Sequence, residues 1–305
     1  MIVYRELSSI EAELGIELKT LYAVSNTLDR HYRKVSLPKK GGGTRTLLVP
    51  SPILKKIQRA IVEKLLVFRP VSHYAKAYKL SASVKKNALP HVGKAKIVKL
   101  DILHFFDSIL YSSVKDKAFP ASLFDEKIRV LLSMLCYYRD SLPQGAPSSP
   151  IISNIVLFDF DEKIGAYCRE RTITYTRYCD DLTFSGNFDE TELIGFVKEE
   201  LKSNGFFLNP RKTAIVPREK RQTVTGIVVN EKLNVAKEYR RAIRQEMHYI
   251  ETYGICEHLK RSCPNVSPDT YLHSLLGRIG YVLSVSPDDA AMLRYRQSIL
   301  ALLHA

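Results

Sequence analysis

Two adjacent carboxylates, Asp180 and Asp181, interrupt two short β-prone runs within residues 172–186. The alternation of apolar residues on either side predicts two strands joined by a tight turn, with the acidic pair at the turn. Neighbouring carboxylates repel one another and raise each other's pKa unless a cation lies close by. The segment therefore predicts a β-hairpin that presents a cation site, whereas the bare dipeptide alone would indicate only turn-forming aspartates.

Asp101 is the natural third acid, because the buried-strand pattern of residues 94–106 places it at or near the C-terminal end of a predicted strand. Mg²⁺ prefers oxygen ligands in octahedral geometry and commonly takes one or two carboxylates together with substrate phosphates. Two such ions about 3.5–4 Å apart activate an attacking hydroxyl and stabilise the leaving oxygen in phosphoryl transfer. We therefore expect the three aspartates to converge on a site for two magnesium ions.

The rest of the chain mixes strands and helices without regular alternation, which favours an α+β fold. A segment rich in lysine and glycine, residues 37–52, predicts a hairpin. Apolar residues at helical spacing predict helices over residues 53–68 and 147–170. Beyond Asn230, alternating basic and apolar positions predict a mainly helical C-terminal subdomain.

The composition narrows the class of partner. The chain of 305 residues is 45% hydrophobic and has a formal net charge of +14 and a pI near 9.5, so its field attracts polyanions such as nucleic acids. It has no signal-peptide pattern and no apolar run of about 18 residues, which predicts a cytoplasmic protein without a membrane partner. Five cysteines without a CxxC pair fit reduced thiols. A zinc site at Cys256, His258 and Cys263 lacks a matching second pair, so ordinary packing or surface positions are favoured.

A turn followed by a helix start occupies residues 141–156. Gly145 supplies the turn, and the prolines and serines after it suit a helix N-terminus. Such a segment would bring backbone amides and Gln144 close to a template or a nucleotide, so we place Gln144 and Gly145 among the candidate nucleotide-binding residues. The alternative is an ordinary helix entry.

Three segments, in this order and spacing, resemble the palm motifs of reverse transcriptases. They are "LDILHFFDSI" with Asp101, "LPQGAPSSPIISN" and "YTRYCDDLTFSG", and with their flanks they cover residues 37–226. Two further elements narrow the resemblance: "NALPH", residues 87–91, matches the NAxxH signature of bacterial retron reverse transcriptases, and "VTG", residues 224–226, matches their VTG signature. The chain thus resembles a retron reverse transcriptase.

The resemblance implies a right-hand polymerase fold, α+β in class, with fingers, a palm built on an antiparallel sheet and helices, and a helical thumb. The fingers and N-terminal helices would occupy residues 1–95, the palm residues 96–230 and the RNA-binding thumb residues 231–305, with part of residues 115–145 completing the fingers. The implied activity is RNA-directed DNA polymerisation, in which Mg²⁺ assists the extension of DNA from deoxynucleoside triphosphates on an RNA template.

By motif match, the resemblance implies that the metal ligands are Asp101, Asp180, Asp181 and the backbone carbonyl of Ile102. Phe106 falls at the family's steric-gate position, where an aromatic ring would exclude a ribose 2′-hydroxyl. A phenylalanine of the hydrophobic core is the alternative for this residue.

Basic residues are implied at the triphosphate. Arg45 matches the fingers arginine that contacts the incoming nucleotide, and a guanidinium suits bidentate phosphate binding. Lys39 and Lys40, beside the glycine run, are weaker candidates. Lys212 resembles the lysine that protonates the pyrophosphate leaving group.

Retron enzymes recognise their own structured non-coding RNA and prime from the 2′-hydroxyl of a guanosine within it, which leaves a branched RNA–DNA molecule. The resemblance implies the same here, in defence against phage, with an effector expected to be a separate polypeptide because the chain ends shortly after the thumb. The candidate RNA-binding residues are Asn87, His91, Val224, Thr225, Gly226, Arg240, Arg241 and Arg244. Two alternatives stay open: another bacterial reverse transcriptase of the defence or group II intron type, and a non-catalytic RNA-binding scaffold for a toxin or effector.

Overall fold

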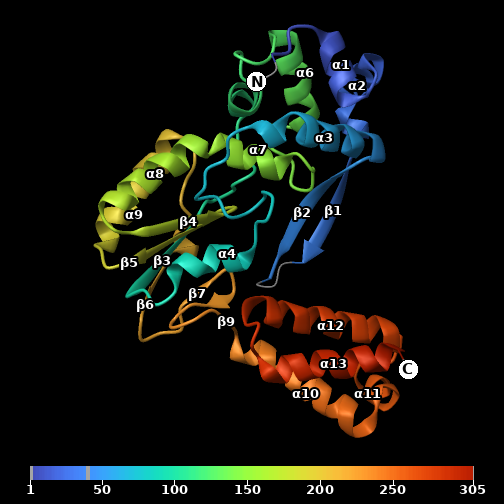
Figure 1. Ribbon diagram of the computed structural model, residues 1–305. Helices are drawn as coiled ribbons and strands as arrows, with labels where there is room; N and C mark the ends of the chain where they lie inside the picture. Colours follow the sequence, from blue (N-terminus) through green and yellow to red (C-terminus); the bar gives the residue numbers. More distant parts are fainter. Residues whose placement is uncertain (1–2, 39–41, 305) are drawn as a thin grey trace. The chain divides into compact units, whose positions relative to one another are not determined.

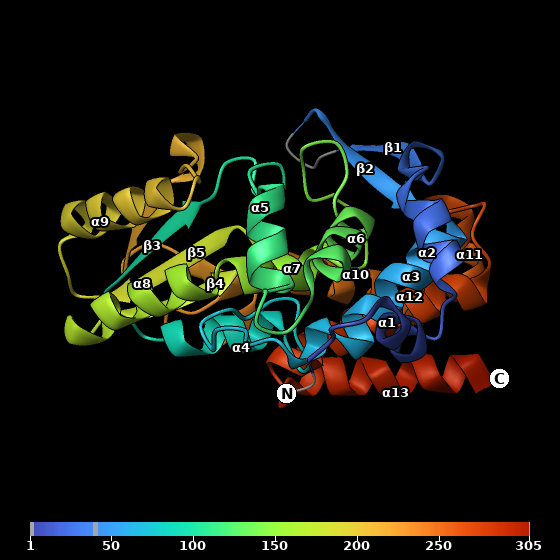
Figure 2. The same cartoon turned by 90° about the horizontal axis from the view of Figure 1, so that it is seen from above.

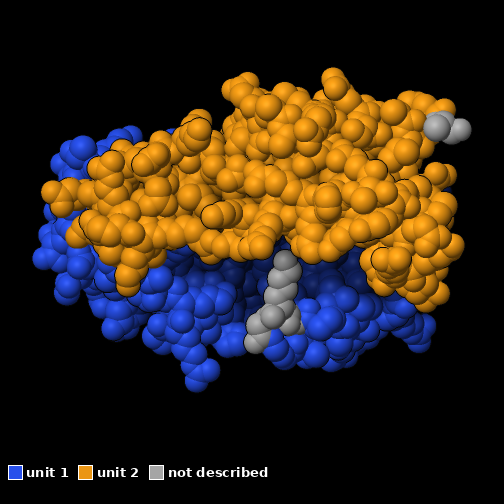
Figure 3. Space-filling model, turned by 90° about the horizontal axis from the view of Figure 1, so that it is seen from below, with its two compact units in different colours: residues 1–82, 98–184, 188–215 blue, residues 83–97, 185–187, 216–305 orange. Residues whose placement is uncertain are grey.

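The computed structural model describes residues 3–38 and 42–304 (Figure 1, Figure 2), so Lys39 and Lys40 lie outside the described residues. Contacts within the chain divide it into two compact units (Figure 3). Unit 1 comprises residues 1–82, 98–184 and 188–215, and unit 2 comprises residues 83–97, 185–187 and 216–305.

A four-stranded sheet carries both acidic segments. Its strand order is β4–β5–β3–β6, with β4 at Thr174–Tyr178, β5 at Asp181–Gly186, β3 at Lys96–Asp101 and β6 at Ala214–Pro217. The predicted hairpin is confirmed by β4 and β5, and the predicted strand that ends at Asp101 is confirmed by β3. Leu182 and Phe184 of β5 are fully buried and join the sheet to the hydrophobic core of unit 1.

Two helices, α8 (Phe158–Glu170) and α9 (Glu190–Ser203), lie side by side against one face of this sheet (Figure 1, Figure 2). Their apolar faces bury Phe160 and Ile164 from α8 and Val197 from α9 in the core of unit 1. The sheet is therefore backed by a layer of helix, which makes it a firm support for the acidic residues at its strand ends.

The single helix predicted over residues 147–170 is wrong, because the chain forms two helices, α7 (Ser149–Val156) and α8. Leu157 separates them, and its φ of −89° and ψ of 9° interrupt the helical conformation. Asp159 and Asp161 then occupy the first turn of α8, where a carboxylate interacts favourably with the helix dipole. The periodicity of apolar residues continues through the break, which is why the sequence alone does not reveal it.

The glycine-rich hairpin is confirmed with different bounds. Strand β1 (Tyr32–Pro38) pairs antiparallel with β2 (Thr44–Pro50), so the hairpin begins before residue 37. Helix α3 (Pro52–Lys64) follows, and the hydroxyl of Ser51 caps it by accepting a hydrogen bond from a backbone N–H of its first turn. The helix predicted to reach residue 68 ends at Lys64.

The remaining helical elements of unit 1 are α1 (Leu7–Leu14), α2 (Leu18–Ser25), α5 (Tyr111–Ser113), a π-helical turn (Val114–Ala118), α6 (Glu126–Cys136) and the 3₁₀ turns Leu28–Arg30, Leu66–Phe68 and Pro210–Lys212.

Unit 2 combines a small sheet with helices. Strands β7 (Thr223–Val224), β8 (Ile227–Val228) and β9 (Asn234–Val235) pair antiparallel. The helical elements are α4 (Val84–Ala88), the 3₁₀ turn Leu89–His91, α10 (Lys237–Tyr253), α11 (Ile255–Ser262), α12 (Pro268–Val285) and α13 (Ala290–His304). The prediction that the chain is mainly helical beyond Asn230 is thus confirmed. Across the part of the chain that the structure describes, no helix has both the length and the apolar character that a membrane span requires.

Candidate active site

The acidic pair closes the β4–β5 hairpin. Cys179 adopts a left-handed backbone with φ 63°, which reverses the chain between the two strands. The backbone carbonyl of Asp180 accepts a hydrogen bond of 3.0 Å from the N–H of Ile102. Because Ile102 directly follows Asp101 at the end of β3, this bond holds the hairpin turn beside the end of that strand.

Asp101, Asp180 and Asp181 all line one cavity of about 700 Å³ in unit 1. Asp101 is 3% exposed, whereas Asp181 reaches solvent. The other sequence candidates that line the same cavity are Arg45, Ile102, Phe106, Gln144 and Lys212. The structure therefore gathers residues that lie more than 160 positions apart in the sequence around a single hollow.

Lys212 is the cation nearest to the buried acid. It ends the 3₁₀ turn Pro210–Lys212, and its Nζ lies 2.5 Å from Oδ2 of Asp101. The hydrogen bond to Asp101 raises the pKa of Lys212, so its ammonium group remains protonated. Asn209 donates from Nδ2 to Oδ1 of Asp101 at 3.1 Å. Sequence analysis missed Asn209: its Asn-Pro dipeptide signals a turn, but nothing in the pattern indicates which side chain it reaches.

Asp181 has a perturbed acidity. Its pKa is raised to about 6, first by partial burial of the carboxyl group and then by the negative charges of Asp180 and Asp101. The repulsion within this cluster of carboxylates is not fully compensated, and a bound cation would relieve it.

The donor atoms suit a hard divalent cation, since they are carboxylate oxygens with a backbone carbonyl beside them. Among the described residues, no three His, Cys, Asp or Glu side chains are already arranged to hold a metal ion. The cation that pairs with Asp101 in this structure is the Lys212 ammonium. The chemistry of the residues thus fits a metal, and binding would require the ammonium and the metal to share or exchange the Asp101 carboxylate.

Replacing Asp181 with asparagine is expected to stabilise the metal-free protein above about pH 6. The folded-state pKa of about 6 lies above the ordinary value of about 3.9, so ionised Asp181 opposes folding. This penalty is absent below about pH 4, grows between pH 4 and 6, and is complete above about pH 6. Because the side chain reaches solvent, screening limits the gain to about 1 kcal/mol or less. Thermal unfolding with a chelator at pH 4 to 8 measures it, and a gain that does not vary with pH would contradict the electrostatic cause.

The wall of the cavity is built by backbone contacts between distant segments. The N–H of Leu48 in β2 donates to the carbonyl of Gln144 at 2.7 Å, and the N–H of Leu142 donates to the carbonyl of Phe106 at 3.2 Å. The half-buried ring of Phe106 packs edge-on against Phe105, with ring centroids 5.1 Å apart. Phe106 therefore lies partly in the hydrophobic core and partly on the cavity wall.

Gly145 does not line the cavity but lies against the backbone of Leu48, which does. Its φ is 118°, and a Cβ added there would lie 2.8 Å from the backbone oxygen of Leu48. The position thus requires glycine for two reasons, a left-handed backbone and the close approach of β2.

We expect Gly145→Ala to destabilise the protein by about 2–4 kcal/mol, because backbone strain adds to the overlap with β2. Chemical denaturation of both proteins measures this loss. The matched control is Gly195→Ala in α9, where an added Cβ meets no atom within 4 Å and alanine favours the helix. Equal changes in the free energy of unfolding at the two positions would show that the close approach of β2 does not cause the loss.

In unit 2 the NAxxH and VTG segments contact each other. Asn87 donates from Nδ2 to the hydroxyl of Thr225 at 3.4 Å, and His91 Nδ1 lies 2.7 Å from the hydroxyl of Ser185. The side chains of Asn87, His91 and Val224 are buried, with exposed fractions of 1% or less. Gly226, in the turn between β7 and β8, is exposed. Burial leaves these three side chains almost no surface with which to contact another molecule.

The remaining candidates lie on the helices of unit 2. Arg241 and Arg244 are exposed on α10, whereas Arg240 is half-buried and pairs with Asp289 at 3.5 Å. His258 is engaged elsewhere, since its Nε2 lies 2.9 Å from the hydroxyl of Tyr271. Of the two cysteines in the zinc alternative, Cys256 is exposed and Cys263 is half-buried.

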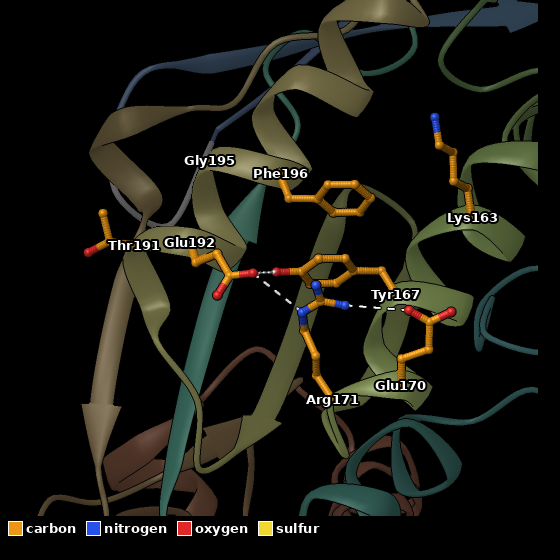
Figure 4. Close-up of a pocket in the computed structure, with 8 residues that line it drawn as sticks. All are labelled: Lys163, Tyr167, Glu170, Arg171, Thr191, Glu192, Gly195 and Phe196. Carbon is orange, nitrogen blue, oxygen red and sulfur yellow. Dashed lines mark hydrogen bonds and ion pairs between the residues drawn. The ribbon is translucent and has the colours of Figure 1, made fainter.

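A second hollow, of about 750 Å³, lies between α8 and α9 (Figure 4). The rings of Tyr167 and Phe196 stack with centroids 4.0 Å apart, and the guanidinium of Arg171 lies 3.9 Å from the centre of the Tyr167 ring. Glu192 accepts hydrogen bonds from both the Tyr167 hydroxyl and Arg171. Because these polar groups pair with one another, the arrangement fastens α8 to α9 and does not resemble a ligand site.

The three aspartates that line the cavity lie within a region of the chain that matches a known protein family. The family model described as "Reverse transcriptase (RNA-dependent DNA polymerase)" matches residues 37–229, which include all three aspartates. Among solved structures, telomerase from Candida albicans in complex with a fragment of telomeric RNA aligns with 92% of this chain and 58% of its own length, at a TM-score of 0.50 and 12% identity. At that identity the match supports the polymerase fold alone.

Similar individual proteins narrow the assignment to one group of reverse transcriptases. The Retron Mx65 reverse transcriptase of Myxococcus xanthus is 32% identical over 97% of this chain and 72% of its own length. The Retron Ec86 and Ec83 reverse transcriptases of Escherichia coli are each 31% identical, over 81% and 84% of this chain and 79% and 84% of their own lengths. The chain therefore belongs to the retron reverse transcriptases, which are RNA-directed DNA polymerases.

Proposed function

We propose that this enzyme uses its own structured non-coding RNA as template and primer and extends it with deoxynucleoside triphosphates into a branched RNA–DNA molecule. The observation that carries the proposal is the single cavity lined by Asp101, Asp180 and Asp181. It is supported by the net charge of +14, which attracts a polyanion, and by the membership of the chain among retron reverse transcriptases.

The three aspartates and the backbone carbonyl of Ile102 are the proposed ligands of two Mg²⁺ ions. When bound, such ions supply Lewis-acid stabilisation of the attacking and leaving oxygens. The chain's own residues position the nucleotide. Arg45 would bind the triphosphate through its planar guanidinium, and Lys212, held protonated by Asp101, would donate a proton to the leaving pyrophosphate.

The cavity wall would select the sugar. The ring of Phe106 would exclude a ribose 2′-hydroxyl, while Gln144 would contact the nucleotide. Gly145 would act indirectly, because it lets the loop that carries Gln144 approach β2.

For the RNA, we propose a division of roles in unit 2. Arg241 and Arg244 would contact phosphates from the exposed face of α10, and the turn at Thr225 and Gly226 would face the RNA. Asn87, His91, Val224 and Arg240, which are buried or paired, would support those surfaces from behind.

The proposed domains are fingers at residues 1–95, palm at 96–230 and thumb at 231–305, with part of residues 115–145 completing the fingers. We further propose that the enzyme acts in the cytoplasm, in defence against phage, with a separate effector protein.

Synthesis on the RNA transcribed from immediately upstream of its gene tests the proposal. With Mg²⁺ and deoxynucleotides, we expect DNA that remains covalently attached to RNA and that a 2′,5′-debranching enzyme releases. Extension only from an added primer, without a branch, would favour a reverse transcriptase of another bacterial type. Tight RNA binding without any product would favour a scaffold.

A further inference from the structure

Arg177, the residue two positions before the acidic turn, is the largest fully buried side chain among the described residues. An ionised group in the interior carries a large desolvation cost unless it is paired and hydrogen-bonded. Its partner is Asp161 of α8, whose side chain is also 0% exposed. A buried pair beside a catalytic turn suggests a role that a pair of apolar side chains does not provide.

The guanidinium of Arg177 makes four hydrogen bonds. Nε and Nη2 donate to the two carboxylate oxygens of Asp161 at 2.8 and 2.6 Å. Nη1 donates to Oδ1 of Asn154 at 3.1 Å and to the backbone carbonyl of Cys179, also at 3.1 Å. Only a planar group with donors in several fixed directions reaches all three partners at once.

The bond to Cys179 reaches the acidic turn directly. The Cys179 carbonyl belongs to the peptide plane that leads into Asp180, so fixing that oxygen fixes the start of the acidic pair. The next carbonyl, that of Asp180, accepts a hydrogen bond from the N–H of Ile102. Cys179 itself is left-handed, a conformation that a residue other than glycine keeps only where its surroundings enforce it.

The partners of Arg177 are themselves fixed. Asp161 accepts a third hydrogen bond, from the Tyr175 hydroxyl at 2.8 Å, and Asn154 of α7 donates to the carbonyl of Ala77 at 2.9 Å. Helix α8, which carries Asp161, is fastened to α9 by the stacked rings of Tyr167 and Phe196 (Figure 4). The turn is thereby connected to the helical layer behind the sheet.

We propose that Arg177, held by Asp161 and Asn154, is a positioning residue that sets the geometry of the metal-binding turn through the Cys179 carbonyl. The inference rests on the proposed function, because it takes Asp180 and Asp181 as metal ligands. It predicts that the buried pair acts on metal affinity and turnover and leaves nucleotide binding and RNA binding largely unchanged.

The test is Arg177→Lys, which keeps the charge but replaces the planar guanidinium with a single nitrogen. Residues that orient metal ligands typically change metal affinity or activity by about 10–100-fold, so we expect a loss of this size in kcat and in Mn²⁺ affinity measured by calorimetry. The KM for deoxynucleotides and the Kd for the RNA should stay within about threefold. The matched control is Arg139→Lys, which alters an exposed arginine that pairs with Asp29 and does not line the cavity, and it should match the wild type.

Asp161→Asn is the second variant, since it preserves the size of the side chain and removes its charge. Wild-type kcat and Mn²⁺ affinity in a folded Arg177→Lys or Asp161→Asn protein overturns the inference. Loss of folding in both also overturns it, in favour of a purely structural ion pair. The double variant Asp180→Asn/Asp181→Asn distinguishes failure of the proposed function from failure of this inference. If the double variant remains active, the proposed metal ligands are wrong. If it is inactive while Arg177→Lys is fully active, only the proposed role of Arg177 is wrong.

Discussion

Replacing Asp180 and Asp181 together with asparagine is expected to lower DNA synthesis by about 10³-fold or more while RNA binding remains within about twofold of the wild type. Metal-assisted phosphoryl transfer gains several kcal/mol of charge stabilisation, and each 1.4 kcal/mol corresponds to a tenfold change in rate. Asparagine preserves the size of each side chain and the hairpin, so the loss would come from the negative charges alone. Single-turnover extension of the RNA, with binding measured in parallel, gives both quantities.

The matched control is Asp140→Asn. Asp140 is an exposed aspartate with φ 57°, a left-handed conformation that asparagine adopts readily, and it does not line the cavity. It should retain wild-type synthesis. Comparable DNA product from the double variant and the wild type would remove the assignment of the acidic pair, and a parallel loss of RNA binding would indicate a folding defect.

The acidic hairpin and the strand before Asp101 were predictable from sequence because their signals are local. Alternating apolar residues define each strand, and a pair of aspartates has few roles between two such strands other than a turn. The grouping of the other cavity residues around the aspartates followed from the motif resemblance and not from their spacing along the chain. Arg45 and Phe106 have no local feature that places them beside Asp101, and the tertiary contacts of β2 and of the loop at Gln144 put them there.

The parts that sequence analysis missed depend on long-range contacts or on burial. Leu157 breaks a helix without a break in apolar periodicity. Arg177 belongs to the motif segment, yet nothing in a strand pattern indicates that an arginine points inward to meet Asp161 of a preceding helix. The same limit applies to Asn87 and His91: a short signature gives their identity, and only the fold shows that their side chains are closed off from solvent.

Shortening Phe106 to alanine is expected to reduce discrimination against ribonucleotides by about 10²-fold, in the range typical of specificity set by the shape of a pocket wall. The ring lines the cavity and packs against Phe105, so under the proposed function it would present a fixed surface to the sugar. Removing it opens space on the side where a 2′-hydroxyl would lie. The expected change is a higher kcat/KM for ribonucleotides, with that for deoxynucleotides lowered only a few-fold.

Phe106→Tyr is the control, because it keeps the ring and should keep the discrimination. The measurement is the ratio of kcat/KM for a deoxynucleotide and its ribonucleotide counterpart on the same RNA. Phe106 also packs on the core, so a general loss of activity toward both nucleotides with an unchanged ratio would assign the ring to stability and not to selection. A changed ratio in a protein with unaltered thermal stability would separate the two roles, because packing energy acts equally on both substrates and only a contact with the sugar distinguishes them.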